Sequence, residues 1–307
     1  MIISENIKNH FVKNFSLPLQ VVTDTYFEYF INLYDQVFQT KQKLEFLIDC
    51  LLKRNNNEET LIHDYYKLKD NIIEDIQNTE VYKLFIGESL DWVTENNNNI
   101  PKMEMFTQQN VNKNFISIDL KNANFHSLLY FANKVKKSHH IFKNEKTYSS
   151  YLKTFTRENY FLDSKHLRQV IFGNCNPKRQ QTIQKHIMNQ LLNLLVTIIP
   201  KERFTTVSSD EIVISKEHDD DKKKCLDILK GHLPDTWIRV SEFTLRQIEN
   251  KPYYVKTYPS GDIEFKSVPA HYFAQVYKRY FEMPIMPVDK TFVFEKQLSV
   301  FVDPLFK

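Results

Sequence analysis

Apolar residues recur at helical spacing through the first third of the chain. Between residues 41 and 53, and again between 61 and 76, they fall three or four positions apart and form one stripe along each segment. Stripes of this kind are typical of amphipathic helices that pack their apolar side on a core. We therefore predict that residues 1–110 form a helical N-terminal region.

From residue 114 the pattern changes to short β-favouring runs that alternate with helical stretches. Residues 115–118 predict a buried strand that ends at Asp119, and the spacing that follows predicts a helix over 120–137. A further helix is predicted over 165–172, before a glycine. Pro177 is well placed to begin the next one, because proline is favoured in the first helical turn.

Two hairpins are predicted in the second half of the chain. The first joins residues 204–207 to 212–215 through four small or acidic residues, and the second joins 253–257 to 262–266 across a Pro-Ser-Gly turn. An antiparallel sheet with helices packed on one face buries this order of elements best.

The fold class that follows is α+β, in three parts. We predict a helical region over 1–110, a sheet domain over 111–270, and a short C-terminal helix and tail over 271–307. No internal repeat divides the chain further.

Composition narrows the chemistry. The 307 residues include 24 Phe and 16 Tyr but only 4 Gly, which excludes a Gly-rich phosphate loop for practical purposes. No apolar run approaches the ~20 residues of a membrane span, so we expect no membrane partner. A net charge of +3 permits nucleic-acid binding. Three widely separated cysteines, Cys50, Cys175 and Cys225, indicate free thiols and a cytoplasmic, reducing location.

Acidic residues stand where two of the predicted strands end. Asp119 closes the first strand, and Asp210 and Glu211 occupy the tip of the first hairpin. If these strands are neighbours, three carboxylates meet at one rim of the sheet. Hard oxygen ligands suit Mg²⁺ or Mn²⁺, and two such ions ~3.5–4 Å apart support in-line phosphoryl transfer. Taken alone, the acidic tip is more typical of a polar hairpin turn.

Three segments resemble, in order, motifs of the right-hand palm polymerases. Residues 117–125, SIDLKNANF, are similar to motif A, above all to the D-L-K-x-A-x-F form of reverse transcriptases. Residues 165–173, KHLRQVIFG, resemble motif B of family B DNA polymerases, with two departures. Residues 208–211, SSDE, are similar to the S-D-D of segmented negative-strand viral RNA polymerases and the A-D-D of reverse transcriptases, with Glu211 for the last aspartate.

This resemblance implies a palm-like sheet and a role for each motif residue. Asp119 and Asp210 would be the catalytic metal ligands, and Glu211 a weaker ligand or an electrostatic neighbour. Lys165 and Arg168, one helical turn apart, would meet the triphosphate of the incoming nucleotide. The same pair also fits a solvated basic face of a helix.

Two further groups of residues follow from the resemblance. Asn124, five positions after the motif A aspartate, stands where these enzymes typically carry the bulky aromatic that excludes a 2′-hydroxyl; Phe125 takes that role if the register shifts by one. Lys251, Tyr253 and Tyr254 resemble the lysine-tyrosine segment that holds the primer end, although a surface hairpin gives the same pattern.

The implied function is a template-directed nucleic-acid polymerase that transfers nucleotidyl groups from nucleoside triphosphates to a 3′-hydroxyl. Its partners would be a primer–template, nucleoside triphosphates and a larger replication assembly. One alternative is a catalytically inactive palm-like subunit that binds nucleic acid or scaffolds a replication complex, which Glu211 and the little room for fingers and thumb domains favour. The other is a helical interaction protein. Retention of both Asp119 and Asp210 favours the enzyme.

Overall fold

A computed structural model of the protein describes residues 3–93, 98, 100, 104–136, 141–302 and 305–306. The N-terminal region is helical, as predicted from its apolar stripes. Its helices are α1 (Glu5–Phe15), α2 (Asp24–Phe38), α3 (Thr40–Leu52), α4 (Glu58–Gln77) and α5 (Glu80–Gly87).

A six-stranded antiparallel sheet follows, in the order β2-β3-β1-β4-β5-β6. The predicted α+β class is therefore confirmed. The strands are β1 (Asn114–Leu120), β2 (Phe204–Val207), β3 (Glu211–Ser215), β4 (Ile238–Gln247), β5 (Tyr254–Thr257) and β6 (Ile263–Lys266). The intervening helices are α6 (Ala123–Lys134), α7 (Tyr148–Lys153), α8 (Asn159–Leu162), α9 (Lys165–Gly173), α10 (Pro177–Leu195) and α11 (Asp221–Leu229).

The two faces of the sheet differ in what they bury. Successive side chains of a strand point to opposite faces. Ile116 and Ile118 of β1, with Ile212 and Ile214 of β3, join the main core together with buried residues of α6, α10 and α11. The other face carries a smaller apolar cluster and several charged side chains. The candidate site lies on this second face.

Some elements differ from their predicted limits. Helix α6 begins at Ala123 rather than at 120, because Asn122 adopts a left-handed conformation with φ of 44°, which asparagine tolerates better than most residues. Strand β4 spans 10 residues. Short 3₁₀ helices lie between the longer elements, at Gln108–Asn110, Phe142–Asn144, Lys201–Arg203, Ala270–Tyr272 and Pro287–Lys290.

The C-terminal part contains more structure than the predicted helix and tail. Helix α12 (Phe273–Tyr280) is followed by a two-stranded hairpin of β7 (Thr291–Phe294) and β8 (Gln297–Val300). Its turn residues Glu295 and Lys296 both have positive φ. Such turns usually carry Asn-Gly or Asp-Gly, so the sequence gives no signal for this one.

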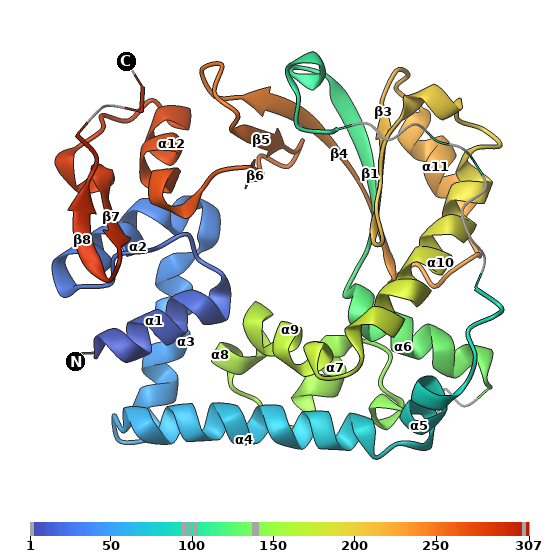
Figure 1. Ribbon diagram of the computed structural model, residues 1–307, viewed down its shortest axis with the longest axis horizontal. Helices are drawn as coiled ribbons and strands as arrows, with labels where there is room; N and C mark the ends of the chain where they lie inside the picture. Colours follow the sequence, from blue (N-terminus) through green and yellow to red (C-terminus); the bar gives the residue numbers. More distant parts are fainter. Residues whose placement is uncertain are drawn as a thin grey trace.

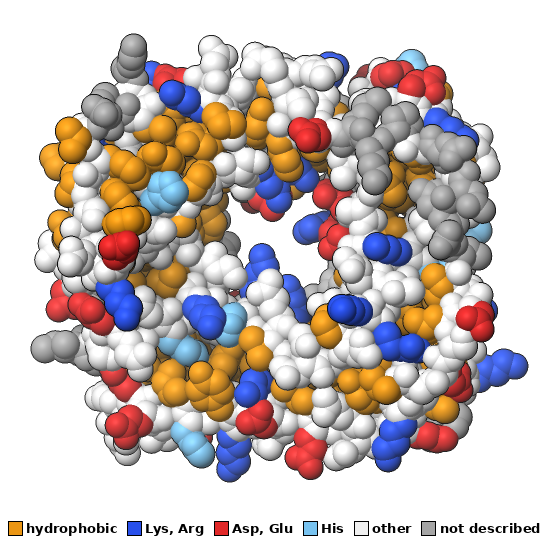
Figure 2. All heavy atoms as spheres, in the orientation of Figure 1, with side chains coloured by type: hydrophobic (Ala, Val, Ile, Leu, Met, Phe, Trp, Pro, Cys, Tyr) orange, Lys and Arg blue, Asp and Glu red, His pale blue; other side chains and the backbone are white. Residues whose placement is uncertain are grey.

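The elements form a ring around a central opening (Figure 1). Helix α4 runs along one side, α3 leads from its end towards α1 and α2, and α12 with the β7–β8 hairpin lies beside α2 (Figure 1). The large sheet and α10 form the opposite part of the ring. Drawn with all heavy atoms, the molecule still shows an opening at its centre (Figure 2).

The three cysteines are buried and none of them forms a disulfide, as predicted. A search of the described helices finds none with both the length and the apolar character needed to cross a membrane.

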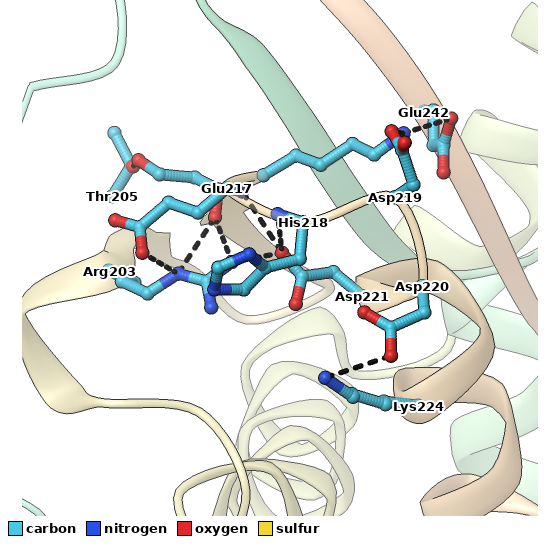
Figure 3. A network of polar contacts seen from close by, with 11 residues as sticks. Arg203, Thr205, Glu217, His218, Asp219, Asp220, Asp221, Lys224 and Glu242 are labelled. Carbon is cyan, nitrogen blue, oxygen red and sulfur yellow. Dashed lines mark hydrogen bonds and ion pairs between the residues drawn. The ribbon is translucent and has the colours of Figure 1, made fainter.

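A buried ion pair fixes the start of α11 to the sheet (Figure 3). Arg203 donates through Nε and Nη2 to the carbonyl oxygen of Ser215, at 3.1 and 2.7 Å, and also pairs with the carboxylate of Asp221. That carboxylate accepts the backbone N–H of Glu217 at 2.9 Å and of His218 at 2.8 Å. Burial opposes ionisation, but Arg203 and the two N–H groups outweigh it and lower the pKa of Asp221 to about 2.

We predict that Asp221→Asn lowers the free energy of unfolding by ~3 kcal/mol, because it leaves buried Arg203 with only the exposed Glu217, at 3.5 Å, as a charge partner. Urea unfolding at neutral pH measures this. The matched control is Asp220→Asn, which removes only an exposed pair with Lys224 at 3.0 Å and should cost no more than ~0.5 kcal/mol.

The pH dependence of this difference has a defined sign. Because the folded pKa of Asp221 is depressed from 3.8 to about 2, its contribution is complete above pH 3.8 and is lost as the pH falls towards 2. The difference in the free energy of unfolding between wild type and Asp221→Asn should therefore become smaller as the pH falls from 3.8 towards 2. A gap that persists at pH 2 would contradict an electrostatic origin.

Candidate active site

The three predicted acidic residues stand at neighbouring backbone positions where β1 pairs with β3. Asp119 lies directly opposite Glu211 in the antiparallel register. One step further, the backbone N–H of Leu120 donates to the carbonyl oxygen of Asp210 at 2.8 Å. The sequence prediction that these strands are neighbours is thus met by their backbone pairing.

Ser208 shapes the hairpin tip that carries Asp210. Its backbone N–H donates to the carbonyl oxygen of Glu211 at 2.8 Å, which closes the turn. Its hydroxyl oxygen accepts the N–H of Glu211 at 2.9 Å and lies 3.1 Å from the Oδ1 atom of Asp210. A short side chain that can both donate and accept is what this turn requires. Asp210 itself is exposed.

The pKa of Asp119 is raised above its ordinary value. Burial raises its pKa, Arg239 on β4 lowers it, and the neighbouring charges of Glu211 and Asp210 raise it again, with a net rise. Arg239 pairs with Asp119 in register and its Nη2 atom donates to Oδ2 at 3.0 Å. The negative charges of the three acids therefore reach one another, and one exposed arginine only partly balances them.

Glu211 is held by two partners on the same face of the sheet. Its Oε1 atom accepts from the Ser117 hydroxyl at 2.6 Å and from Lys256 Nζ at 3.1 Å. The Lys256 side chain is only 4% exposed, and its Nζ lies 4.5 Å from the centre of the Phe243 ring. A buried lysine of this kind requires a counter-charge, and Glu211 supplies it.

The donor atoms fit a divalent cation of the magnesium type. Asp119 and Asp210 offer carboxylate oxygens, the ligands that Mg²⁺ and Mn²⁺ prefer. Among the residues that the structure describes, no three His, Cys, Asp or Glu side chains converge closely enough to hold a metal ion. Glu211 instead contacts Ser117 and Lys256.

Helix α9 is joined to the turn that follows Asp119. Ser164 caps the helix, its hydroxyl oxygen accepting the N–H of Leu167 at 2.9 Å. Arg168 donates through Nη1 to Oδ1 of Asn122 at 2.9 Å, three positions after Asp119. Lys165 is exposed on the first turn of α9. The structure therefore links the predicted triphosphate-binding helix to the acidic site through Arg168.

The two candidate sugar-contacting residues have different environments. Asn124 is partly exposed, and its Oδ1 atom accepts from Gln184 Nε2 at 2.7 Å. Phe125 is fully buried and stacks on Phe142 with ring centres 4.2 Å apart. A ring with no exposed surface cannot touch a nucleotide in this conformation, which leaves Asn124 as the residue facing outward.

The predicted primer-binding residues lie apart from the carboxylates. Tyr254 pairs with Gln247, at the opposite end of β4 from Arg239. The Tyr253 and Tyr254 side chains are both buried, and Lys251 occupies the connection between β4 and β5. The structure therefore does not place these three residues beside the acids.

Sequence reasoning missed Arg239, Lys256 and Ser117. A signal was present for Lys256, which is the one charged residue in the otherwise β-favouring run Tyr253–Thr257. Arg239 and Ser117 become candidates only when the register of β1 with β3 and β4 is known.

Comparisons of the chain with protein-family models, with curated proteins and with solved structures found no match. Function must therefore be inferred from the residues and contacts described above.

We predict that Asp119→Asn raises the free energy of unfolding at neutral pH in buffer without divalent metal. The raised folded pKa means that ionised Asp119 destabilises the folded protein above pH 3.8, and this cost disappears when the group is protonated in both states. The lost pair with Arg239 costs little, since that side chain is 64% exposed. Denaturant unfolding across pH measures the gain, which should vanish below pH 3.8.

The control is Asp227→Asn, an exposed acid on α11 that lies outside the site and should change little. Destabilisation by Asp119→Asn at neutral pH would contradict the prediction that ionised Asp119 destabilises the folded protein. Adding Mg²⁺ should stabilise the wild type more than the variant if Asp119 binds the ion.

Proposed function

We propose that this chain is a template-directed nucleic-acid polymerase of the palm type, acting with Mg²⁺ or Mn²⁺ and within a larger replication assembly. The observation that supports this most is the pairing of β1 with β3, which sets Asp119 opposite Glu211 and beside Asp210. The motif order in the sequence and the link from Arg168 to the Asp119 turn add to it.

The proposed reaction forms one bond and breaks one. The 3′-hydroxyl oxygen of the growing chain bonds to the α-phosphorus of a nucleoside triphosphate, the α–β phosphoanhydride bond breaks, and pyrophosphate leaves. The hydroxyl proton passes to solvent or to a nearby carboxylate. Arg168 and Lys165 on α9 would bind the triphosphate oxygens through charge-assisted hydrogen bonds. Divalent ions held by Asp119 and Asp210 would supply the electrostatic stabilisation of the developing charge.

A second candidate is a catalytically inactive palm-like subunit that binds nucleic acid or scaffolds a replication complex. The observation that favours it is the pair of internal cations at the acids. Arg239 contacts Asp119, and buried Lys256 contacts Glu211, so the protein already balances part of the charge that metal ions would otherwise balance. A subunit that has lost metal binding would be expected to show this arrangement.

We predict that Asp210→Asn lowers nucleotide incorporation by ~10²-fold or more, the usual cost of losing one preorganised electrostatic group. Primer extension with Mg²⁺ and with Mn²⁺ measures it. Folding should be unaffected, because the side chain is exposed at a hairpin tip.

Asp262→Asn is the matched control. Asp262 also lies at a hairpin tip and accepts from the serine two positions earlier, at 2.7 Å from Ser260. The Asp262→Asn substitution should leave nucleotide incorporation unchanged. If neither the wild type nor Glu211→Asp incorporates nucleotides with either metal, the inactive subunit is the better description.

We also predict that ribonucleotides are used at least as well as deoxyribonucleotides. Gln184 occupies Oδ1 of Asn124, which leaves the Nδ2 group to donate to a 2′-hydroxyl. One such hydrogen bond is worth ~0.5–1.5 kcal/mol, or roughly 2- to 10-fold in preference. Competition between matched nucleoside triphosphates tests this, and Asn124→Tyr should shift the preference towards deoxyribonucleotides.

The control for this prediction is Phe125→Leu, a change within the core that should leave sugar preference unaltered. A strong deoxyribonucleotide preference in the wild type that relaxes in Phe125→Leu would mean that Phe125, not Asn124, selects the sugar.

A further inference from the structure

The ring is closed on the C-terminal side by contacts between α12 and α2. Phe265 of β6 packs on Phe273 of α12 with ring centres 5.1 Å apart, which joins the sheet to α12. Tyr34 of α2 then packs on Phe273 at 5.5 Å and on Tyr277 at 5.2 Å. These aromatic contacts connect the edge of the sheet to the N-terminal helices.

A buried polar group holds the same junction. Asp289 has no exposed surface; it pairs with Lys278 of α12 at 2.8 Å and accepts from the Tyr29 hydroxyl of α2 at 2.7 Å. The Lys278 side chain is 4% exposed. Separating the two side chains would leave a buried charge without its partner, which is strongly unfavourable. The ion pair therefore favours the closed junction.

The N-terminal helices close the ring on the other side. Arg54, just after α3, pairs with Asp64 of α4 at 2.8 Å and with Glu158, at the start of α8, also at 2.8 Å. The Tyr65 hydroxyl of α4 lies 2.8 Å from Nδ1 of His166 in α9. Because α9 is joined through Arg168 to the turn after Asp119, the chain of contacts returns to the sheet and the ring is complete.

The opening inside this ring lies next to the candidate active site. Strand β1 and the tip of the β2–β3 hairpin lie along its edge (Figure 1). Lys and Arg side chains lie around the opening, with Asp and Glu side chains among them (Figure 2). Positive charge along a passage suits a phosphate backbone. A positively charged groove that follows the backbone is how proteins bind a single strand.

We infer that a single strand of nucleic acid passes through the central opening and is enclosed by the chain, so that it can enter or leave only by an end. The inference rests on the proposed function for its choice of partner. It goes beyond that function, because a palm site needs to contact a strand but does not need to surround it.

The experiment uses the full chain as Asp210→Asn, in buffer without divalent metal, so that no synthesis takes place. Protein is bound to a linear single strand with biotin at both ends, streptavidin is added to block the ends, and the complex is challenged with high salt. Salt weakens a complex held only by phosphate contacts by ~10³-fold or more. An enclosed strand should instead be released at least ~10-fold more slowly than an unblocked one.

Three arms of the same experiment test enclosure. Adding streptavidin before the protein, or replacing the linear strand by a covalently closed circle of the same sequence, should abolish the salt-resistant complex. Equal retention on the circle would overturn the inference, as would equally fast release from blocked and unblocked strands. Retention on a blocked duplex of the same length would overturn the single-strand assignment.

A variant tests the junction directly. Asp289→Asn leaves buried Lys278 without a counter-charge and should speed release from the blocked strand, whereas Tyr29→Phe keeps the ion pair and should behave nearly as the parent. If circular dichroism shows that the Asp289→Asn variant is unfolded, the comparison of circular with linear strands alone decides whether the strand is enclosed.

Primer extension by the wild type, measured separately, distinguishes the two proposals. Extension without trapping would overturn enclosure and leave the polymerase standing. Trapping without extension would support enclosure and favour the inactive subunit. No binding to any strand would overturn both.

Discussion

The cost of an ionised, partly buried Asp119 beside two further acids is the constraint on which the rest of the site depends. Asp119 lies opposite Glu211, and burial first, then the nearby charges of Glu211 and Asp210, raise its pKa. The protein offsets this with Arg239 across the neighbouring strand and with buried Lys256. The unfavourable charge that these cations leave unbalanced can be neutralised by an added cation, which would stabilise the folded protein.

The ion pairs elsewhere in the molecule have a different character. Arg203 with Asp221, Arg54 with Glu158, and Lys278 with Asp289 are largely buried and have further hydrogen-bonding partners. A buried pair adds little stability over apolar packing, but it strongly penalises any arrangement that separates the partners. These three pairs tie α11, α8 and α12 to their neighbours. Uncompensated charge is thereby concentrated at the acidic rim while the supporting frame is held in one arrangement.

Local patterns predicted most of what surrounds the acids. Short β-favouring runs predicted β1 and the first hairpin, a helical stretch before a glycine predicted α9, and the acids were found because they stand where strands end. The antiparallel register then converts Asp119, Asp210 and Glu211 from separate motif residues into neighbours. Phe125 was harder to assign, because the sequence does not say which of two adjacent side chains faces the core.

What the sequence could not predict depends on contacts between distant segments. Lys256 reaches Glu211 across 45 positions, and Asp289 reaches Tyr29 across 260. No local pattern encodes such pairs, since the residue types alone allow many partners. The β7–β8 hairpin was missed for a related reason: its turn has positive φ at Glu295 and Lys296, where only the surrounding structure compensates for the missing glycine.

The contacts of Glu211 explain why a glutamate fits the position where the motif has aspartate. Its longer side chain reaches both the Ser117 hydroxyl and Lys256, and so satisfies a lysine that the sheet buries. An aspartate would carry its carboxylate one methylene nearer the backbone and would leave Lys256 less well paired. Glu211 therefore has a structural reason to differ from the motif, and the difference alone does not count against catalysis. The choice between the two proposals, an active polymerase and an inactive palm-like subunit, rests instead on Asp119 and Asp210, which have no buried lysine as a partner among the described contacts.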